Sequence, residues 1–391
     1  MRKKHFLFAS VLALLCGSSA LHAQDFKLTS SGYFKNQGVD IMAFDDIYPE
    51  GHQGGVCIIM NGHRVATNGD IRLEATPGQW QPVPKQLDRK LGDNSITATL
   101  CYPDSSRHLT GFNPMIYPDL HLIYTVNVES KGKNIEVTVD LDRPIPQEFI
   151  GKVGFNLEFF PGSLFGKPWI MDGQSGIFPQ QPNSPLMTTQ PNYLHTGNYH
   201  DGKQSLADMD KLIGKGYSPI VADDIISEPY AKGRKFTSRP DDPYNKVTIE
   251  SLSGDLQLFD GRMNHNNGWF VLRSNIKPGV TKGAVKWIIT PNVVADWMYQ
   301  PVIQTSQIGY HPTQDKEAVI EMDIRDNRKE TAQIIRIDAD GEKVVKNVTP
   351  ANWGKFLRYN YLKVDFTDVK EPGLYKIKYD TSVSPIFRID N

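Results

Sequence analysis

The sequence predicts an all-β protein, with a large β-sandwich-like domain followed by a second, smaller β-sandwich. Apolar residues occupy every second position in residues 134–141, which is typical of a half-buried antiparallel strand. Turn-forming pairs such as Asn61-Gly62 and Pro278-Gly279 separate this run from others like it. Many short strands joined by such turns favour a sandwich over a fold in which strands alternate with helices.

The first residues have the organisation of a signal peptide. Residues 2–4 are basic, residues 6–15 are mostly apolar, and Ala23 offers a cleavage site. The apolar run is shorter than the roughly 20 residues that a transmembrane helix needs, and no later stretch is suited to span a membrane. We therefore predict that residues 1–23 are a signal peptide and that the protein is exported, to the periplasm or outside the cell. Lipoprotein anchoring through Cys16 is less favoured, because Leu15 stands where a small residue should precede the modified cysteine.

The charge of the chain gives little reason to expect a charged partner. Removal of residues 1–23 leaves 40 basic and 44 acidic residues, a net charge near −4. Nucleic-acid-binding proteins usually carry a clustered basic face, so a nucleic-acid partner is not expected. A neutral partner such as a polysaccharide fits this composition better.

Residues 24–300 are predicted to form one β-rich domain. Within it, Ser205 and Asp208 resemble a capping box, and Gly214 is suited to end the single predicted helix. Residues 173–245 are rich in Pro, Gly, Asn and Asp and lack a clear period, so they are predicted to be mostly loop. The predicted strands include residues 56–60, 96–102, 120–128, 134–141, 153–160, 246–251, 269–274 and 284–290.

Two cysteines follow the predicted signal peptide, and both lie in apolar β-type runs. An oxidising compartment would permit a disulfide between Cys57 and Cys101. Free cysteine is also among the most buried residue types, and two buried thiols are the favoured alternative.

Residues 301–391 are predicted to form an immunoglobulin-like sandwich that begins at Pro301. Seven short strands in about ninety residues match the strand number of such a domain. The predicted strands are residues 302–310, 316–323, 332–338, 342–346, 361–366, 373–379 and 385–389.

A short motif gives this second domain a resemblance to a known family. Residues 306–312 read Ser-Gln-Ile-Gly-Tyr-His-Pro. They resemble the opening strand of the Ig-like domain that precedes the catalytic barrel in glycoside hydrolase family 9, the cellulase family. Scattered pieces of residues 24–300 are similar to the long N-terminal extension of family 9 proteins from Bacteroidetes. These pieces include residues 68–70, 76–80, 154–158, 171–173 and 260–262.

The resemblance does not extend to the catalytic machinery of the family. Family 9 enzymes invert the anomeric centre. They use a carboxylate base that activates a water molecule and a carboxylic acid that protonates the leaving oxygen, and the two groups are far enough apart to admit that water. Their Asp-Ala-Gly-Asp base motif is missing, and Asp223-Asp224, which follows Val221-Ala222, lacks the glycine. No series of amphipathic helices could build the barrel. We therefore assign no catalytic residue, cofactor or metal, and we expect the isolated chain not to hydrolyse β-glucans.

Glycan contact is the accessory role that the aromatic residues favour. Sugar rings stack on exposed aromatic faces, and their hydroxyls pair with neighbouring amide, carboxylate and guanidinium groups. The alternative for each of these aromatic residues is that it fills the core and keeps a polar tip at the surface. Solvated or turn-stabilising roles are favoured for the carboxylates of the large domain, Glu158 and Asp172 among them. The candidate glycan contacts are Trp80, Trp169, Asp172, Tyr193 and Tyr199.

The second domain is predicted to act mainly as a docking brace. Its candidate docking residues are Trp353, which we place in a loop, together with Phe356 and Tyr359. By resemblance, the chain is the non-catalytic N-terminal portion of an exported endo-β-1,4-glucanase that acts in polysaccharide degradation. Its expected partners are a family 9 catalytic barrel and a β-glucan. The first alternative is a free-standing glycan-binding protein, and the next is an independent enzyme in the large domain.

Overall fold

The computed structural model describes residues 25–45, 54–74, 77, 84–104, 120–184, 227–263 and 268–391. Within these ranges the regular structure is all β apart from three short 3₁₀ turns, which confirms the predicted fold class. No helix in the described ranges is long and apolar enough to cross a membrane. The predicted signal peptide, Cys16 and the helix predicted from Ser205 lie outside these ranges.

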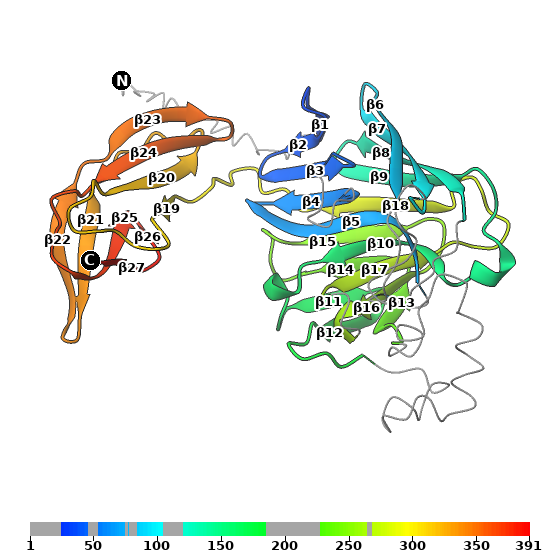
Figure 1. The fold of residues 1–391 in the computed structure, drawn as a ribbon. Coiled ribbons are helices and arrows are strands. Elements are labelled where there is room, and N and C mark those ends of the chain that lie inside the picture. Colours follow the sequence, from blue (N-terminus) through cyan, green and yellow to red (C-terminus); the bar gives the residue numbers. More distant parts are fainter. Residues whose placement is uncertain are drawn as a thin grey trace, which may run out of the picture.

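Residues 27–291 build two nine-stranded sheets, in which every paired strand is antiparallel to its neighbour (Figure 1). The first sheet has the order β1-β2-β3-β4-β5-β10-β17-β16-β13, and the second has the order β12-β11-β14-β15-β18-β9-β8-β7-β6. The strand bounds are β1 Lys27–Leu28, β2 Phe34–Asn36, β3 Val39–Ala43, β4 Val56–Met60, β5 His63–Leu73, β6 Lys85–Leu91, β7 Ser95–Tyr102, β8 Leu122–Lys131, β9 Asn134–Leu141, β10 Val153–Phe159, β11 Pro168–Met171, β12 Gln174–Ile177, β13 Ala231–Gly233, β14 Lys235–Ser238, β15 Val247–Ser251, β16 Leu256–Asp260, β17 Phe270–Asn275 and β18 Val285–Pro291. The 3₁₀ turns are η1 Gln147–Phe149, η2 Pro161–Ser163 and η3 Gly261–Met263.

Apolar side chains from the two sheets meet in one core. The ring of Phe155 on β10 packs edge-on against Trp287 on β18, with 5.0 Å between ring centroids. The Trp287 indole N–H donates to the Ser274 hydroxyl at 3.1 Å, which satisfies the polar end of a fully buried tryptophan. The contact joins the middle of one sheet to the middle of the other.

The turns follow from local chemistry. Asn61 and Gly62 both have positive φ, 52° and 83°, and connect β4 to β5 as a two-residue hairpin. Such hairpins require positive φ at both positions, for which Asn-Gly is the preferred pair. The expected long loop at residues 173–245 is wrong in part, because β12, β13 and β14 lie inside it. These strands are only three or four residues long, too short to show a period.

Residues 302–389 build two further sheets around a second apolar core. One has the order β19-β20-β24-β23, and in the other β22-β21-β25-β26 is joined by β27, which pairs with β25. Figure 1 shows them at the left, reached by the extended segment that follows β18. The bounds are β19 Val302–Gln304, β20 Glu317–Asp323, β21 Ala332–Asp338, β22 Gly341–Val348, β23 Ala351–Phe356, β24 Tyr359–Asp365, β25 Gly373–Tyr379, β26 Ser382–Val383 and β27 Phe387–Ile389.

One strand of this smaller sandwich was not expected. Trp353, placed in a loop by the sequence, lies in the edge strand β23. The alternation of this strand is hidden because its pairing with β24 shifts between Asn352 and Gly354, and because most of its side chains are exposed. Bulges of this kind are frequent on edge strands.

Candidate functional site

A buried polar network lies on one face of the first sheet, on the neighbouring strands β5, β10 and β17. Asn156 on β10 stands opposite Asp70 on β5 and opposite Arg273 on β17. Residues directly opposite in an antiparallel pair carry their side chains on the same face. Phe155 and Leu157 alternate with Asn156 and belong to the apolar core, so the side chain of Asn156 lies on the other face of β10.

Arg273 is the centre of one half of this network. Its guanidinium, with the residue only 1% exposed, donates to side-chain oxygens of Glu74, Asn156 and Asn275 and to the backbone carbonyls of Glu74 and Lys152, at 2.8–3.1 Å. Gly154 makes this placement possible, because a Cβ there would lie 2.8 Å from the Arg273 Nε. The buried cation is therefore fully enclosed by acceptors, as a buried charge requires.

The other half of the network is centred on Asp70. The Tyr124 hydroxyl donates to its Oδ1 at 2.8 Å, and the Ile71 backbone N–H donates to the same atom at 2.8 Å. The Arg72 guanidinium lies 3.6 Å from its Oδ2. Leu73 donates its backbone N–H to the Tyr102 hydroxyl, because β4 pairs with β5 only as far as Gly69 and leaves this edge of β5 open. Two tyrosines of the second sheet thus form hydrogen bonds with the first.

Glu158 adds a third buried carboxylate. Asn68 donates its side-chain N–H to Glu158 Oε2 at 2.7 Å, while the Asn68 Oδ1 has no hydrogen-bond partner among the described residues. A solvated or turn-stabilising charge was expected at Glu158, and this is wrong, because the residue is 2% exposed and lies within β10, next to its last residue.

Burial shifts the acid–base behaviour of the network. It raises the pKa of Asp70 to about 6, and the nearby Arg72 guanidinium and Tyr124 hydroxyl offset only part of this rise. Burial raises the pKa of Glu74 to about 7 in spite of its contact with Arg273. Two carboxyls that titrate near neutrality can exchange protons under ordinary conditions, which is a property of many functional sites and of some structural ion networks.

Sequence reasoning missed this network for a definite reason. The run Asp70-Ile71-Arg72-Leu73-Glu74 alternates charged and apolar residues, which normally indicates a strand with one solvated face. An alternating sequence shows that the two faces of a strand differ in polarity. It does not show whether the polar face is exposed to solvent or buried.

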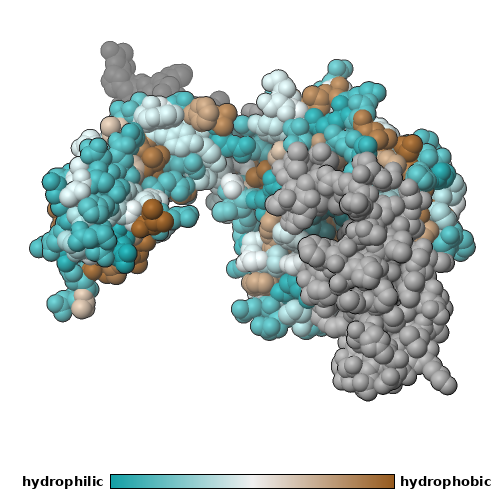
Figure 2. Space-filling model, viewed as in Figure 1, coloured by the Kyte–Doolittle hydropathy of each residue, from teal (hydrophilic) through white to brown (hydrophobic). Residues whose placement is uncertain are grey.

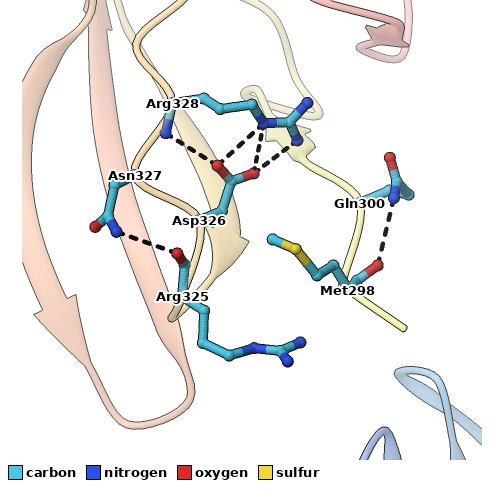
Figure 3. Close-up of a pocket in the computed structure, with 6 residues that line it drawn as sticks. All are labelled: Met298, Gln300, Arg325, Asp326, Asn327 and Arg328. Carbon is cyan, nitrogen blue, oxygen red and sulfur yellow. Dashed lines mark hydrogen bonds and ion pairs between the residues drawn. The ribbon is translucent and has the colours of Figure 1, made fainter. Parts of the chain in front are cut away.

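A second candidate region lies where the large sandwich meets the smaller one. A shallow hollow of about 640 Å³ is lined by Met298 and Gln300 of the connecting segment and by residues 325–328. Figure 3 shows the Arg328 guanidinium spread over the Asp326 carboxylate, while the Arg325 side chain extends away from that pair. Arg325 also lines a deeper cleft of about 570 Å³ on the side of the large sandwich.

The described candidates for glycan contact in the large domain have structural roles. Trp169 is 6% exposed. Its ring packs over Gly176 of the paired strand and stacks on Tyr230, with 6.5 Å between ring centroids. A ring enclosed in this way offers no free face to a sugar. The Asp172 carboxylate accepts the backbone N–H groups of Arg234 and Lys235 at 2.8 and 3.0 Å and so fastens a turn. Trp80, Tyr193 and Tyr199 lie outside the described residues.

The docking candidates lie together at one edge of the smaller sandwich. Trp353 and Phe356 on β23 are 58% and 57% exposed, and Tyr359 on β24 is half-buried. The Trp353 ring stands edge-on to Tyr361, with 5.6 Å between centroids. Figure 2 shows apolar side chains among hydrophilic ones along the upper edge of this domain, over the hairpin of β23 and β24.

Neither a disulfide nor a metal site is found in the described part of the chain. Cys57 and Cys101 lie on different sheets and form no disulfide with each other, and Cys101 is only partly buried. The Cys57 sulfur lies 3.1 Å from the Thr67 hydroxyl. No group of three or more His, Cys, Asp or Glu side chains in the described ranges is placed to hold a metal ion.

The comparison with protein families finds a match in the smaller sandwich. No curated protein matches the chain. Residues 298–384 match the family described as the cellulase N-terminal Ig-like domain. The matched residues run from the segment before β19 to the end of β26, and they include Tyr310, whose hydroxyl donates to the Glu317 carbonyl and accepts the Ser306 backbone N–H. This part of the chain is similar to the N-terminal region of a cellulase.

Proposed function

We propose that this chain is the non-catalytic N-terminal portion of an exported family 9 glycoside hydrolase of the endo-β-1,4-glucanase type. The match of residues 298–384 to the cellulase N-terminal Ig-like domain is the observation that carries this proposal. The resemblance of residues 306–312 to the opening strand of that domain in family 9 supports the narrower assignment. The signal-peptide pattern of residues 1–23 supports export.

In this proposal the Ig-like domain braces a catalytic barrel through the face that contains Trp353, Phe356 and Tyr359. Two large aromatic side chains more than half exposed on one edge strand are unusual for a surface without a partner. An edge strand also has backbone groups free for further contacts. Inter-domain contacts of about 600–1,500 Å² are common within one chain, and a face of this kind is suited to provide part of such an area.

The test joins the chain to a family 9 barrel and measures the thermal midpoint of the barrel. The double variant Trp353→Ala/Phe356→Ala should lower this midpoint. Ile386→Ala is the matched control, because Ile386 is 61% exposed and precedes β27 in the other sheet. An unchanged midpoint together with a loss of glucan affinity would instead favour the free-standing glycan-binding protein.

The buried network favours a second candidate, an independent acid–base site in the large domain. Asp70, with a pKa of about 6, lies on β5, and Glu74, with a pKa of about 7, follows the end of this strand, while Glu158 lies on the neighbouring strand β10. General acids and bases work best when their pKa lies near the working pH. Release of reducing ends from carboxymethylcellulose or xyloglucan by the pure chain separates the candidates. The first expects none, and the second expects activity that Glu158→Gln abolishes.

A further inference from the structure

The cleft at the junction of the two sandwiches is built from five separate pieces of chain. The β2–β3 hairpin, the turn at Gly62, the connecting segment 297–299, the turn 323–325 and the β23–β24 hairpin tip 357–359 all line it. Its volume of about 570 Å³ falls within the roughly 300–1,000 Å³ of ordinary ligand sites. The cleft does not involve the buried network on β5, β10 and β17.

Aromatic rings form one wall of this cleft. Trp297 lies 6.3 Å from Tyr299, and Tyr299 lies 5.0 Å from Tyr359, measured between ring centroids. All three side chains are half-buried, so part of each ring is open. Glycines of the large sandwich seat two of them, because a Cβ at Gly38 would lie 2.7 Å from the Trp297 ring and one at Gly62 would lie 3.0 Å from Tyr299. The wall is therefore held by close packing.

Both carboxylates that line the cleft are paired with arginines, and Lys35 adds a further cation to the lining. The Arg358 guanidinium lies 3.2 Å from the Asp40 carboxylate across the junction, and Arg325 binds Asp323 through Nε at 2.8 Å. Arg325 also donates to the Trp297 carbonyl at 2.7 Å, which fixes the connecting segment. Because each of these carboxylates already has its cation, a strongly cationic ligand is not favoured.

Several polar groups of the cleft have hydrogen-bonding capacity to spare. Within the described residues, no hydrogen bond is found for the hydroxyls of Tyr33 and Tyr359, and the Arg358 guanidinium has only its contact to Asp40. Gln37 uses its side-chain N–H on the Trp297 carbonyl and keeps its side-chain oxygen open. Hydroxyl, amide and guanidinium groups beside aromatic rings are the chemistry that recognises a neutral ligand with many hydroxyls.

We propose that this junction cleft binds a stretch of neutral oligosaccharide. The open faces of Trp297 and Tyr359 receive the C–H surfaces of the sugar rings. Tyr33, Gln37 and Arg358 pair with the sugar hydroxyls. The choice of β-1,4-glucan as first probe rests on the proposed function. Oligosaccharide binding is measured without a catalytic barrel, so its outcome does not depend on whether the Ig-like domain braces one.

The experiment titrates the mature chain with cellohexaose, xylohexaose, mannohexaose and hexagalacturonate, by calorimetry and by tryptophan fluorescence. We expect at least one neutral hexasaccharide to bind more tightly than hexagalacturonate. Tyr359→Ala should weaken that binding by about tenfold, a typical effect of losing one aromatic contact. Tyr33→Phe, which removes only a hydroxyl, should have a smaller effect in the same direction.

The control is Trp353→Ala, which removes an exposed ring outside the cleft and should leave the dissociation constant unchanged. Near-UV circular dichroism verifies that each variant is folded. If Tyr359→Ala is not folded, Arg358→Gln replaces it as the cleft variant. Absence of binding to every neutral hexasaccharide at millimolar concentration overturns the proposal. So does unchanged binding by the folded cleft variants, tighter binding of hexagalacturonate, or loss of binding in Trp353→Ala.

Discussion

The two sandwiches of this chain differ in where their charged and apolar residues lie. The large sandwich buries Asp70, Glu74 and Arg273, each at most 1% exposed. The Ig-like domain keeps most of its arginine–carboxylate pairs near the surface, where the Arg328 side chain remains 42% exposed beside Asp326. It also exposes apolar residues, among them Leu357 at 80%.

This difference indicates where each domain is specialised. A buried charge is tolerated only when its hydrogen bonds are nearly complete, so the interior network of the large sandwich must be made as a unit. Exposed aromatic residues contribute little to the stability of their own domain and are available for contact with another surface. The distinctive feature of the large sandwich is thus its buried polar network, and that of the Ig-like domain is its exposed apolar side chains.

The largest expected effect comes from breaking the interior network. Arg273→Met should lower the free energy of unfolding of the large sandwich by about 3–5 kcal/mol, because it leaves the buried Glu74 carboxylate without its cation. Arg388→Met is the matched control in the Ig-like domain, where the side chain is 65% exposed and its loss should change stability by less than about 0.5 kcal/mol. The measurement is chemical denaturation followed by circular dichroism. Equal effects of the two variants would contradict the contrast.

The pH dependence of stability should have opposite signs in the two domains. The pKa values of Asp70 and Glu74 are raised to about 6 and about 7. The folded state therefore holds more protons than the unfolded state between pH 4 and 7, and the large sandwich should lose on the order of 3 kcal/mol for each of the two carboxyls as pH rises through that range. Arg325 lowers the pKa of Asp323 to about 2, so the Ig-like domain should lose stability as pH falls from about 4 to 2.

Denaturation midpoints at several pH values verify both signs, provided that each domain is followed by its own signal. Glu74→Gln should flatten the slope of the large sandwich between pH 5 and 7. A wild-type stability that is constant from pH 4 to 7, or that rises over this range, would show that the interior carboxyls do not titrate as inferred.

A smaller effect is expected from separating the two sandwiches. Two apolar cores with no shared residue predict that residues 298–391 fold alone and that their deletion changes the stability of the remainder by about 1 kcal/mol. The direct polar contacts across the junction are few, with Arg358–Asp40 and the Arg325 bond to the Trp297 carbonyl the main ones in the described residues. Near-UV circular dichroism of the isolated fragment decides the matter, and an unfolded fragment would show that the cores depend on each other.

The smallest effect is expected at the exposed face of the Ig-like domain. Trp353→Ala should change the free energy of unfolding of the chain itself by less than about 0.5 kcal/mol, since the ring is more than half exposed. Trp287→Ala in the large sandwich is the contrasting variant, with an expected loss of about 3–5 kcal/mol for a fully buried ring. Thermal and chemical denaturation of both variants compare them directly. A large loss in Trp353→Ala would assign this tryptophan to the core.

The sequence by itself determined the fold class and about half of the strands. Alternation located β9 at Asn134–Leu141 without error, and the Asn61-Gly62 pair located the β4–β5 hairpin, because both signals depend on neighbouring residues alone. Only the tertiary structure decided which polar faces are buried. Glu158 and Trp169 were judged from their neighbours in sequence, yet the burial of each depends on strands and loops distant in the chain. The junction cleft has the same origin, since Tyr33, Trp297 and Tyr359 meet only when two separately built sandwiches are brought together.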